Sequence, residues 1–144
     1  MIKKQVTKIL VPLDGSKNSR RGLEMAISVA RQFGATITGV YSINAPPHSE
    51  FRGVGSVQES LNDEIKKFMD EAKVLAAQNG IVFKEKMMRG DVGYNIVKLA
   101  QNKKEKFNLI VIGSRGRVSV KEMIFGSVSN YVIHAAKIPV LIVK

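Results

Sequence analysis

Residues 108–136 read NLIVIGSRGRVSVKEMIFGSVSNYVIHAA. The run from Asn108 to Ile112, in which every residue after Asn108 is apolar, predicts a short strand of the kind found in a parallel sheet covered on both faces. A helix pattern follows from about Ser127 to Ala136. The segment between the two elements begins with Gly113 and Ser114 and ends with Gly126. The stretch therefore predicts a strand, a glycine-containing loop and a helix start, which together favour an α/β fold.

The rest of the chain repeats this alternation of strand and helix. Strands are predicted at residues 8–13, 35–43, 81–88, 108–112 and 139–143, and helices at about 16–33, 57–79, 91–102 and 127–136. Lys84 and Lys86 alternate in the third strand and indicate a sheet edge. The segment from Asn44 to Ser56 has no periodicity and is predicted to be a loop, and the sequence leaves open whether it folds over a ligand. We expect one open, mainly parallel, Rossmann-like sheet with four helices on its two faces.

Composition limits the class of protein. The 144 residues suit a single domain over 1–144, and the formal charge is +11. The chain has no cysteine and no apolar stretch long enough to cross a bilayer, so we expect a cytoplasmic protein without membrane contact. Its two histidines form no cluster, so no metal site is predicted. A nucleic-acid-binding module is the least favoured class, because aromatics make up only 6% of residues and the basic residues are scattered.

The glycine loop has the spacing G-x2-G-x9-G, formed by Gly113, Gly116 and Gly126, with Ser127 and Ser129 directly after it. Glycines allow positive φ and close approach of the backbone, so that amide groups converge on an oxyanion. Unpaired amides of a first helical turn also attract phosphate. The alternative is that the glycines only make turns and Ser127 only caps a helix. The loop has neither the G-x4-G-K-[ST] nor the G-x-G-x-x-G pattern.

Three segments together resemble the universal stress protein family, in particular its ATP-binding branch. They are ILVPLDGS at the start, the loop with its following helix, and IPVLIV at the end. The resemblance extends from Lys8 to Val143 and implies a sheet in the order 3-2-1-4-5. It also implies a homodimer through antiparallel pairing of the last strands, from Ile138 to Val143. An apolar edge strand of this kind would otherwise be exposed.

The resemblance also implies roles for single residues. Asp14 would bind the ribose, backbone at Val40 would read the adenine edge, and Pro12 and Ile112 would line the base pocket. The remaining positions would hold ribose and phosphates of ATP, ADP or AMP: Gly113, Gly116, Arg117, Gly126, Ser127, Val128 and Ser129. A Mg²⁺ ion would accompany the phosphates, bound chiefly by the nucleotide.

Two of these assignments have a simpler alternative. Asp14 follows a strand, where a carboxylate also closes turns by bonding its own loop. Arg115 and Arg117 lie inside the loop, where long basic side chains are often only solvated.

The predicted function is nucleotide-dependent regulation in a stress response, with a downstream partner that the sequence does not identify. The alternative is a slow ATPase or a phosphoryl or nucleotidyl transferase, for which no catalytic residue is assigned.

Overall fold

The computed structural model describes residues 5–43, 55–116 and 125–144. Within these residues the elements are β1 (Lys8–Pro12), α1 (Lys17–Phe33), β2 (Thr36–Ile43), α2 (Gly55–Gln78), β3 (Phe83–Arg89), α3 (Val92–Ala100), β4 (Leu109–Gly113), α4 (Ser127–Ala135) and β5 (Val140–Val143). The strands form one parallel sheet in the order β3-β2-β1-β4-β5. The predicted fold class, the strand order and the edge position of the lysine-bearing strand are confirmed.

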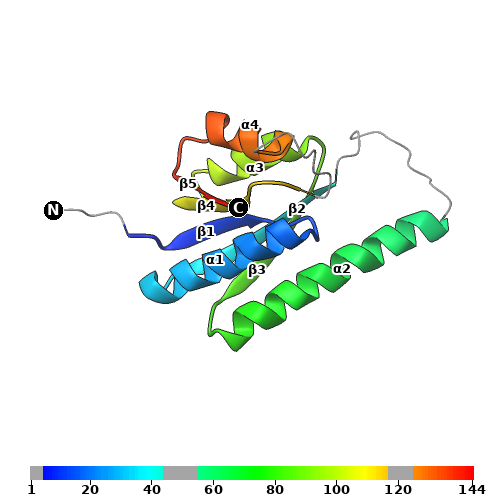
Figure 1. Cartoon of the computed structure of the whole chain (residues 1–144), viewed down its shortest axis with the longest axis horizontal. Coiled ribbons are helices and arrows are strands. Elements are labelled where there is room, and N and C mark those ends of the chain that lie inside the picture. Colours follow the sequence, from blue (N-terminus) through cyan, green and yellow to red (C-terminus); the bar gives the residue numbers. More distant parts are fainter. Residues whose placement is uncertain (1–4, 44–54, 117–124) are drawn as a thin grey trace.

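The sheet separates two layers of helices, with α3 and α4 on one side and α1 and α2 on the other (Figure 1). Strand β1 shows why both faces are apolar: Ile9 and Val11 belong to the core below α1 and α2, and Leu10 belongs to the core below α3 and α4. All three side chains are 0% exposed. Burial on both faces is what a continuous apolar strand predicts in a parallel sheet.

Three predicted boundaries are wrong by two residues. The third strand begins at Phe83 rather than 81, because Gly80 has φ 71° and the amide of Ile81 still donates to the carbonyl of Ala76. Helix α3 ends before residue 102, whose amide donates to Leu99 only three positions back. The loop predicted for 44–56 extends too far, because α2 begins at Gly55, where a glycine avoids the cost it has in a helix interior. Residues 44–54 lie outside the described part of the chain.

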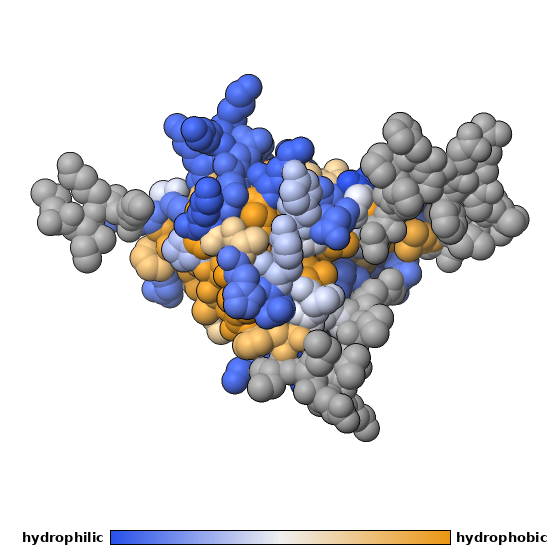
Figure 2. Space-filling model, turned by 90° about the horizontal axis from the view of Figure 1, so that it is seen from above, coloured by the Kyte–Doolittle hydropathy of each residue, from blue (hydrophilic) through white to orange (hydrophobic). Residues whose placement is uncertain are grey.

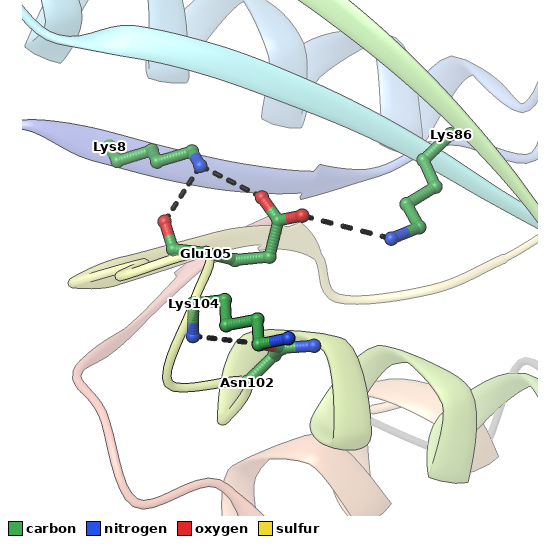
Figure 3. A network of polar contacts seen from close by, with 5 residues as sticks. All are labelled: Lys8, Lys86, Asn102, Lys104 and Glu105. Carbon is green, nitrogen blue, oxygen red and sulfur yellow. Dashed lines mark hydrogen bonds and ion pairs between the residues drawn. The ribbon is translucent and has the colours of Figure 1, made fainter.

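An ion pair fixes the edge of the sheet where the strands begin. The ammonium of Lys8 donates to the side chain of Glu105 at 2.8 Å and to its backbone carbonyl at 2.7 Å, and Lys86 lies 3.9 Å from the same carboxylate (Figure 3). The hydrogen bond and charge of Lys8 hold the pKa of Glu105 below its usual range, with smaller contributions from Lys86 and Lys84. This network joins β1 to the connection between α3 and β4.

The outer surface carries both apolar and polar side chains. The view from above faces the side of α3 and α4 and shows hydrophobic residues between hydrophilic ones (Figure 2). Tyr94 on α3 is 54% exposed and Tyr131 on α4 is 43% exposed. No helix in the described part of the chain is both long enough and apolar enough to cross a bilayer.

Candidate functional site: a cavity where the strands end

A cavity of about 410 Å³ opens at the edge of the sheet where the strands end. It lies beside the ends of β1, β2 and β4, and residues from the starts of α3 and α4 complete its wall. Strand β1 is the switch point of the topology, because the chain proceeds from it to β2 on one side and reaches β4 on the other. Ligands in open α/β sheets bind at such a point.

The structure brings the predicted site residues together at this cavity. Those that line it are Pro12, Asp14, Val40, Ile112, Gly113, Gly116, Gly126, Ser127, Val128 and Ser129. Arg117 lies outside the described residues. Arg115 also lines the cavity and is half-buried, so among the described residues it is the loop arginine that faces this space.

Asp14 links the two loops that meet at the switch point. One of its carboxylate oxygens accepts a hydrogen bond from the amide of Ser16 at 2.8 Å, which is the turn-closing role considered for it. The other oxygen faces Gly116: a Cβ atom at residue 116 would lie 2.9 Å from it. Gly116 therefore has to be small because the Asp14 carboxylate occupies the adjacent space.

Of the two properties predicted for the loop glycines, positive φ and close approach of the backbone, the structure shows only the second. None of Gly113, Gly116 and Gly126 has a positive φ, so the expectation of left-handed backbone at these positions is wrong. Space is the requirement at Gly113, where a Cβ would lie 2.6 Å from the backbone carbonyl oxygen of Asn18 in α1. A Cβ at Gly126 would meet nothing closer than 3.5 Å. The glycines thus allow the backbone to approach other atoms closely. A Cβ would clash with the protein's own atoms at Gly113 and Gly116, but not at Gly126.

The start of α4 has no side-chain cap. Its N-cap residue is Gly126, which has no side chain to act as a cap, and no side chain among the described residues accepts from the amides of the first turn. The hydroxyl of Ser129 instead donates to the carbonyls of Ser114 at 2.8 Å and Gly126 at 3.1 Å, and the amide of Gly126 donates to the same Ser114 carbonyl at 2.7 Å. Ser129 therefore shapes the loop, and the backbone amides of the first turn are left to attract an anion.

The other end of the cavity is mainly apolar and includes residues that the sequence did not indicate. Val92 and Ile96 come from α3, and Ser42 is the polar residue beside them at the end of β2. The signal that could have found them is Asp91, which caps α3 directly after β3 and so places the start of this helix at the same edge of the sheet. The backbone carbonyl of Val40 accepts from the amide of Leu13 at 2.8 Å, so the sheet already uses it.

The charged groups of the site are few. Asp14 and Arg115 are the charged residues among the described residues that line the cavity. No group of three or more histidine or carboxylate side chains in the described part of the chain is arranged to hold a metal ion. The site therefore offers backbone amides and one arginine to an anion, and apolar walls to a flat ring.

Fold and cavity define a small open α/β domain with a ligand cleft at the switch point of its sheet. Residues 5–144 match the model of the universal stress protein family. The chain is 34% identical over 147 residues to universal stress protein YxiE of Bacillus subtilis, covering 95% of this chain and 98% of the relative. The chain belongs to the universal stress protein family.

Solved structures agree with the fold. Universal stress protein UspA from Lactobacillus plantarum superposes with a TM-score of 0.86 at 23% identity, covering 99% of this chain and 100% of that one. The universal stress protein from Archaeoglobus fulgidus in complex with dAMP is 26% identical, with a TM-score of 0.72 over 96% of this chain and 98% of that one. An adenine nucleotide is thus bound by a protein that shares this fold.

Proposed function

We propose that this stress protein binds an adenine nucleotide, ATP in the first place, and that occupancy regulates a conformation or a partnership. The observation that carries the proposal is the start of α4, which borders the cavity beside a glycine loop and whose first-turn amides have no side-chain cap among the described residues. Such a helix start favours phosphate because the amides and the helix dipole both attract negative charge.

The opposite end of the cavity suits an adenine ring. Pro12 and Ile112 line it, as the resemblance implied, together with Val40 of β2 and with Val92 and Ile96 of α3. The volume of about 410 Å³ lies within the range of cavities that bind small molecules. The dAMP complex of the Archaeoglobus fulgidus relative supports the same ligand class. We expect the carboxylate of Asp14, which also lines the cavity, to bind the ribose.

Binding is favoured over rapid turnover. Asp14 is the only acid among the described residues that line the cavity, and one of its oxygens already accepts from the Ser16 amide. Mg²⁺ would be held chiefly by the nucleotide's own phosphates, with chemistry limited to neutralising their charge. Phosphate release should be measured with Mg²⁺ and excess ATP. A multiple-turnover rate of about 1–100 per second, typical of kinases, would contradict a regulatory role.

Calorimetric titration with ATP tests the binding site. We expect Gly116→Val and Gly126→Val each to weaken binding by at least about tenfold: the first pushes on the Asp14 carboxylate, and the second adds methyl groups at the start of α4. Gly34→Asn is the matched control, because Gly34 ends α1 with φ 69° and open space around it, and asparagine tolerates that conformation. Wild-type affinity in both valine variants would refute the site.

The last strand supports a homodimer. β5 is an edge strand paired only with β4, and its Leu141 side chain is 36% exposed. Antiparallel pairing of two such strands would satisfy both open edges and cover the apolar side chains. We expect sedimentation of the wild type to give a dimer, and that of Leu141→Lys to give a monomer because like charges would face each other across the pairing. A monomeric wild type would refute the dimer.

A further inference from the structure

We infer that Ser42, oriented by Asn95, is a specificity-determining residue of the cavity and donates a hydrogen bond to a ring nitrogen of the adenine base. The inference rests on the proposed adenine-nucleotide function and adds a residue to it. Neither Ser42 nor Asn95 belongs to the glycine loop.

Ser42 occupies a distinctive place in the cavity wall. Side chains alternate along a strand, so Ser42 lies on the same face of β2 as Val40, which also lines the cavity. Val92 and Ile96 of α3 form the facing part of the wall. A mainly apolar wall with one polar group is the usual design of a small-molecule site, in which the polar group fixes the ligand's orientation.

Asn95 decides which way the Ser42 hydroxyl acts. Its side-chain nitrogen lies 2.9 Å from the Ser42 oxygen and 2.8 Å from the backbone carbonyl oxygen of Arg89. A carbonyl oxygen only accepts, so this atom of Asn95 must be the NH₂ group rather than the amide oxygen. Asn95 therefore donates to Ser42, whose oxygen is the acceptor in this pair.

This arrangement leaves the Ser42 hydroxyl hydrogen for the ligand. A serine hydroxyl has one hydrogen and two lone pairs, and Asn95 uses one lone pair. No acceptor for that hydrogen is found among the residues that the structure describes. Asn95 itself is 7% exposed and is held in α3, so the lone pair it engages stays fixed in direction. The remaining donor lies at the wall of the cavity.

A purine ring nitrogen is the acceptor that such a site fits. Adenine is a flat ring that packs between apolar side chains and carries lone-pair nitrogens at positions 1, 3 and 7. A donor enclosed by Val40, Val92 and Ile96 is penalised when the ligand leaves it unpaired. The Ser42 hydroxyl thus favours adenine over a ring of the same shape that lacks the nitrogen.

The test combines serine variants with adenine analogues. Affinities for ATP and for its 1-deaza, 3-deaza and 7-deaza forms are measured by calorimetry for the wild type, Ser42→Val and Ser42→Thr. Valine and threonine have nearly the same shape, and only threonine keeps the hydroxyl. We expect one deaza analogue to bind the wild type about five to ten times more weakly than ATP. Threonine should keep that difference, and valine should lose it while binding ATP about five to ten times more weakly.

The positioning role of Asn95 is tested in the same way. In Asn95→Asp the carboxylate only accepts, so the Ser42 hydroxyl would turn toward it and away from the ligand. We expect the discrimination against the same analogue to disappear in this variant, with no further loss when it is combined with Ser42→Val.

The outcomes separate this inference from the proposed function. A wild type that binds ATP but discriminates against none of the deaza analogues would overturn the inference alone. So would a Ser42→Val variant that keeps the wild-type discrimination. A wild type that binds neither ATP nor AMP would overturn both the proposed function and the inference.

Discussion

Helices α1 and α4 both begin at the edge of the sheet where the strands end, but the side chain of the N-cap residue caps α1 and not α4. The N-cap residue of α1, Ser16, has φ −75° and ψ 159° and accepts from the amide of Ser19 at 3.1 Å. Gly126 of α4 has nearly the same backbone, φ −70° and ψ 165°, but no side chain to act as a cap. The difference therefore comes from residue type and not from backbone geometry.

The contrast shows that two helix starts with similar backbone geometry can use their polar side chains differently. In α1 the polar groups bond each other, since Asp14 accepts from Ser16 and the Ser19 hydroxyl donates to the Ser16 carbonyl. In α4 the hydroxyl of Ser129 is used to hold the loop carbonyls. The Ser19 amide of α1 thus has an acceptor within its own helix start, whereas the described residues give the first-turn amides of α4 no side-chain acceptor.

The largest effect on stability is expected where the end of β4 contacts the start of α1. In Gly113→Ala the new methyl group would lie 2.6 Å from the carbonyl oxygen of Asn18 in α1, so the backbone has to move. We expect a loss of about 2–3 kcal/mol in the free energy of unfolding, measured by urea denaturation. Gly126→Ala is the control and should lose less, because its methyl group meets only ordinary contacts. Equal losses in both variants would contradict the account.

Removing the cap of α1 should affect stability but not binding. Ser16→Ala deletes the acceptor of the Ser19 amide, and we expect about 1 kcal/mol less stability in urea denaturation. The affinity for ATP should change by less than about twofold, since the hydrogen bond between Ser16 and Ser19 is internal to the start of α1. A large loss of affinity at unchanged stability would show that the two helix starts do not differ as described.

Adding a cap to α4 should do the reverse. Gly126→Ser places a hydroxyl on a backbone that matches that of Ser16, so the side chain can accept from a first-turn amide. We expect a gain of a few tenths of a kcal/mol in stability without ligand. Affinity for ATP should fall about fivefold, because the amide then has an internal partner. Unchanged affinity in a variant that is clearly stabilised would argue against phosphate at this helix start.

The smallest effect on stability is expected at the opposite edge of the sheet, where Lys8 and Glu105 form an ion pair far from the cavity. The pKa of Glu105 is lowered by Lys8, so its ionised form stabilises the folded protein. This contribution is present above the ordinary value of 4.5 and is lost as the pH falls through the depressed folded pKa. The stability difference between wild type and Glu105→Gln should therefore shrink over that range, and ATP should not alter it. A difference that grows with acidity would reverse the assigned sign.

Much of the fold follows from short local patterns. The strand predicted at 108–112 is observed at Leu109–Gly113. Ser16 and Asp91 cap helices and Gly34 ends one, and these residue types favour such positions. The strand order came from the family resemblance, because local patterns do not fix which strands pair.

The site was only partly predictable for a physical reason. The loop glycines and Asp14 lie next to strand ends, so sequence proximity indicates them. Ser42 and Asn95 lie 53 positions apart and meet only because β2 packs beneath α3. The role of Gly113 likewise depends on Asn18, in a helix far away in the sequence. Contacts of this kind require the pairing of elements to be known first.

Nuclear magnetic resonance of the backbone amides tests the central claim most directly. ¹⁵N-labelled protein is titrated with ATP, and the amides of Ser127 and Val128 at the start of α4 are compared with that of Ser19 at the start of α1. The account predicts large saturable shifts and slowed hydrogen exchange at Ser127 and Val128. Ser19 also lines the cavity, but its amide is already bonded to Ser16, so its hydrogen exchange should not change. ATP binding that leaves the first turn of α4 unperturbed, or that perturbs both helix starts equally, would contradict it.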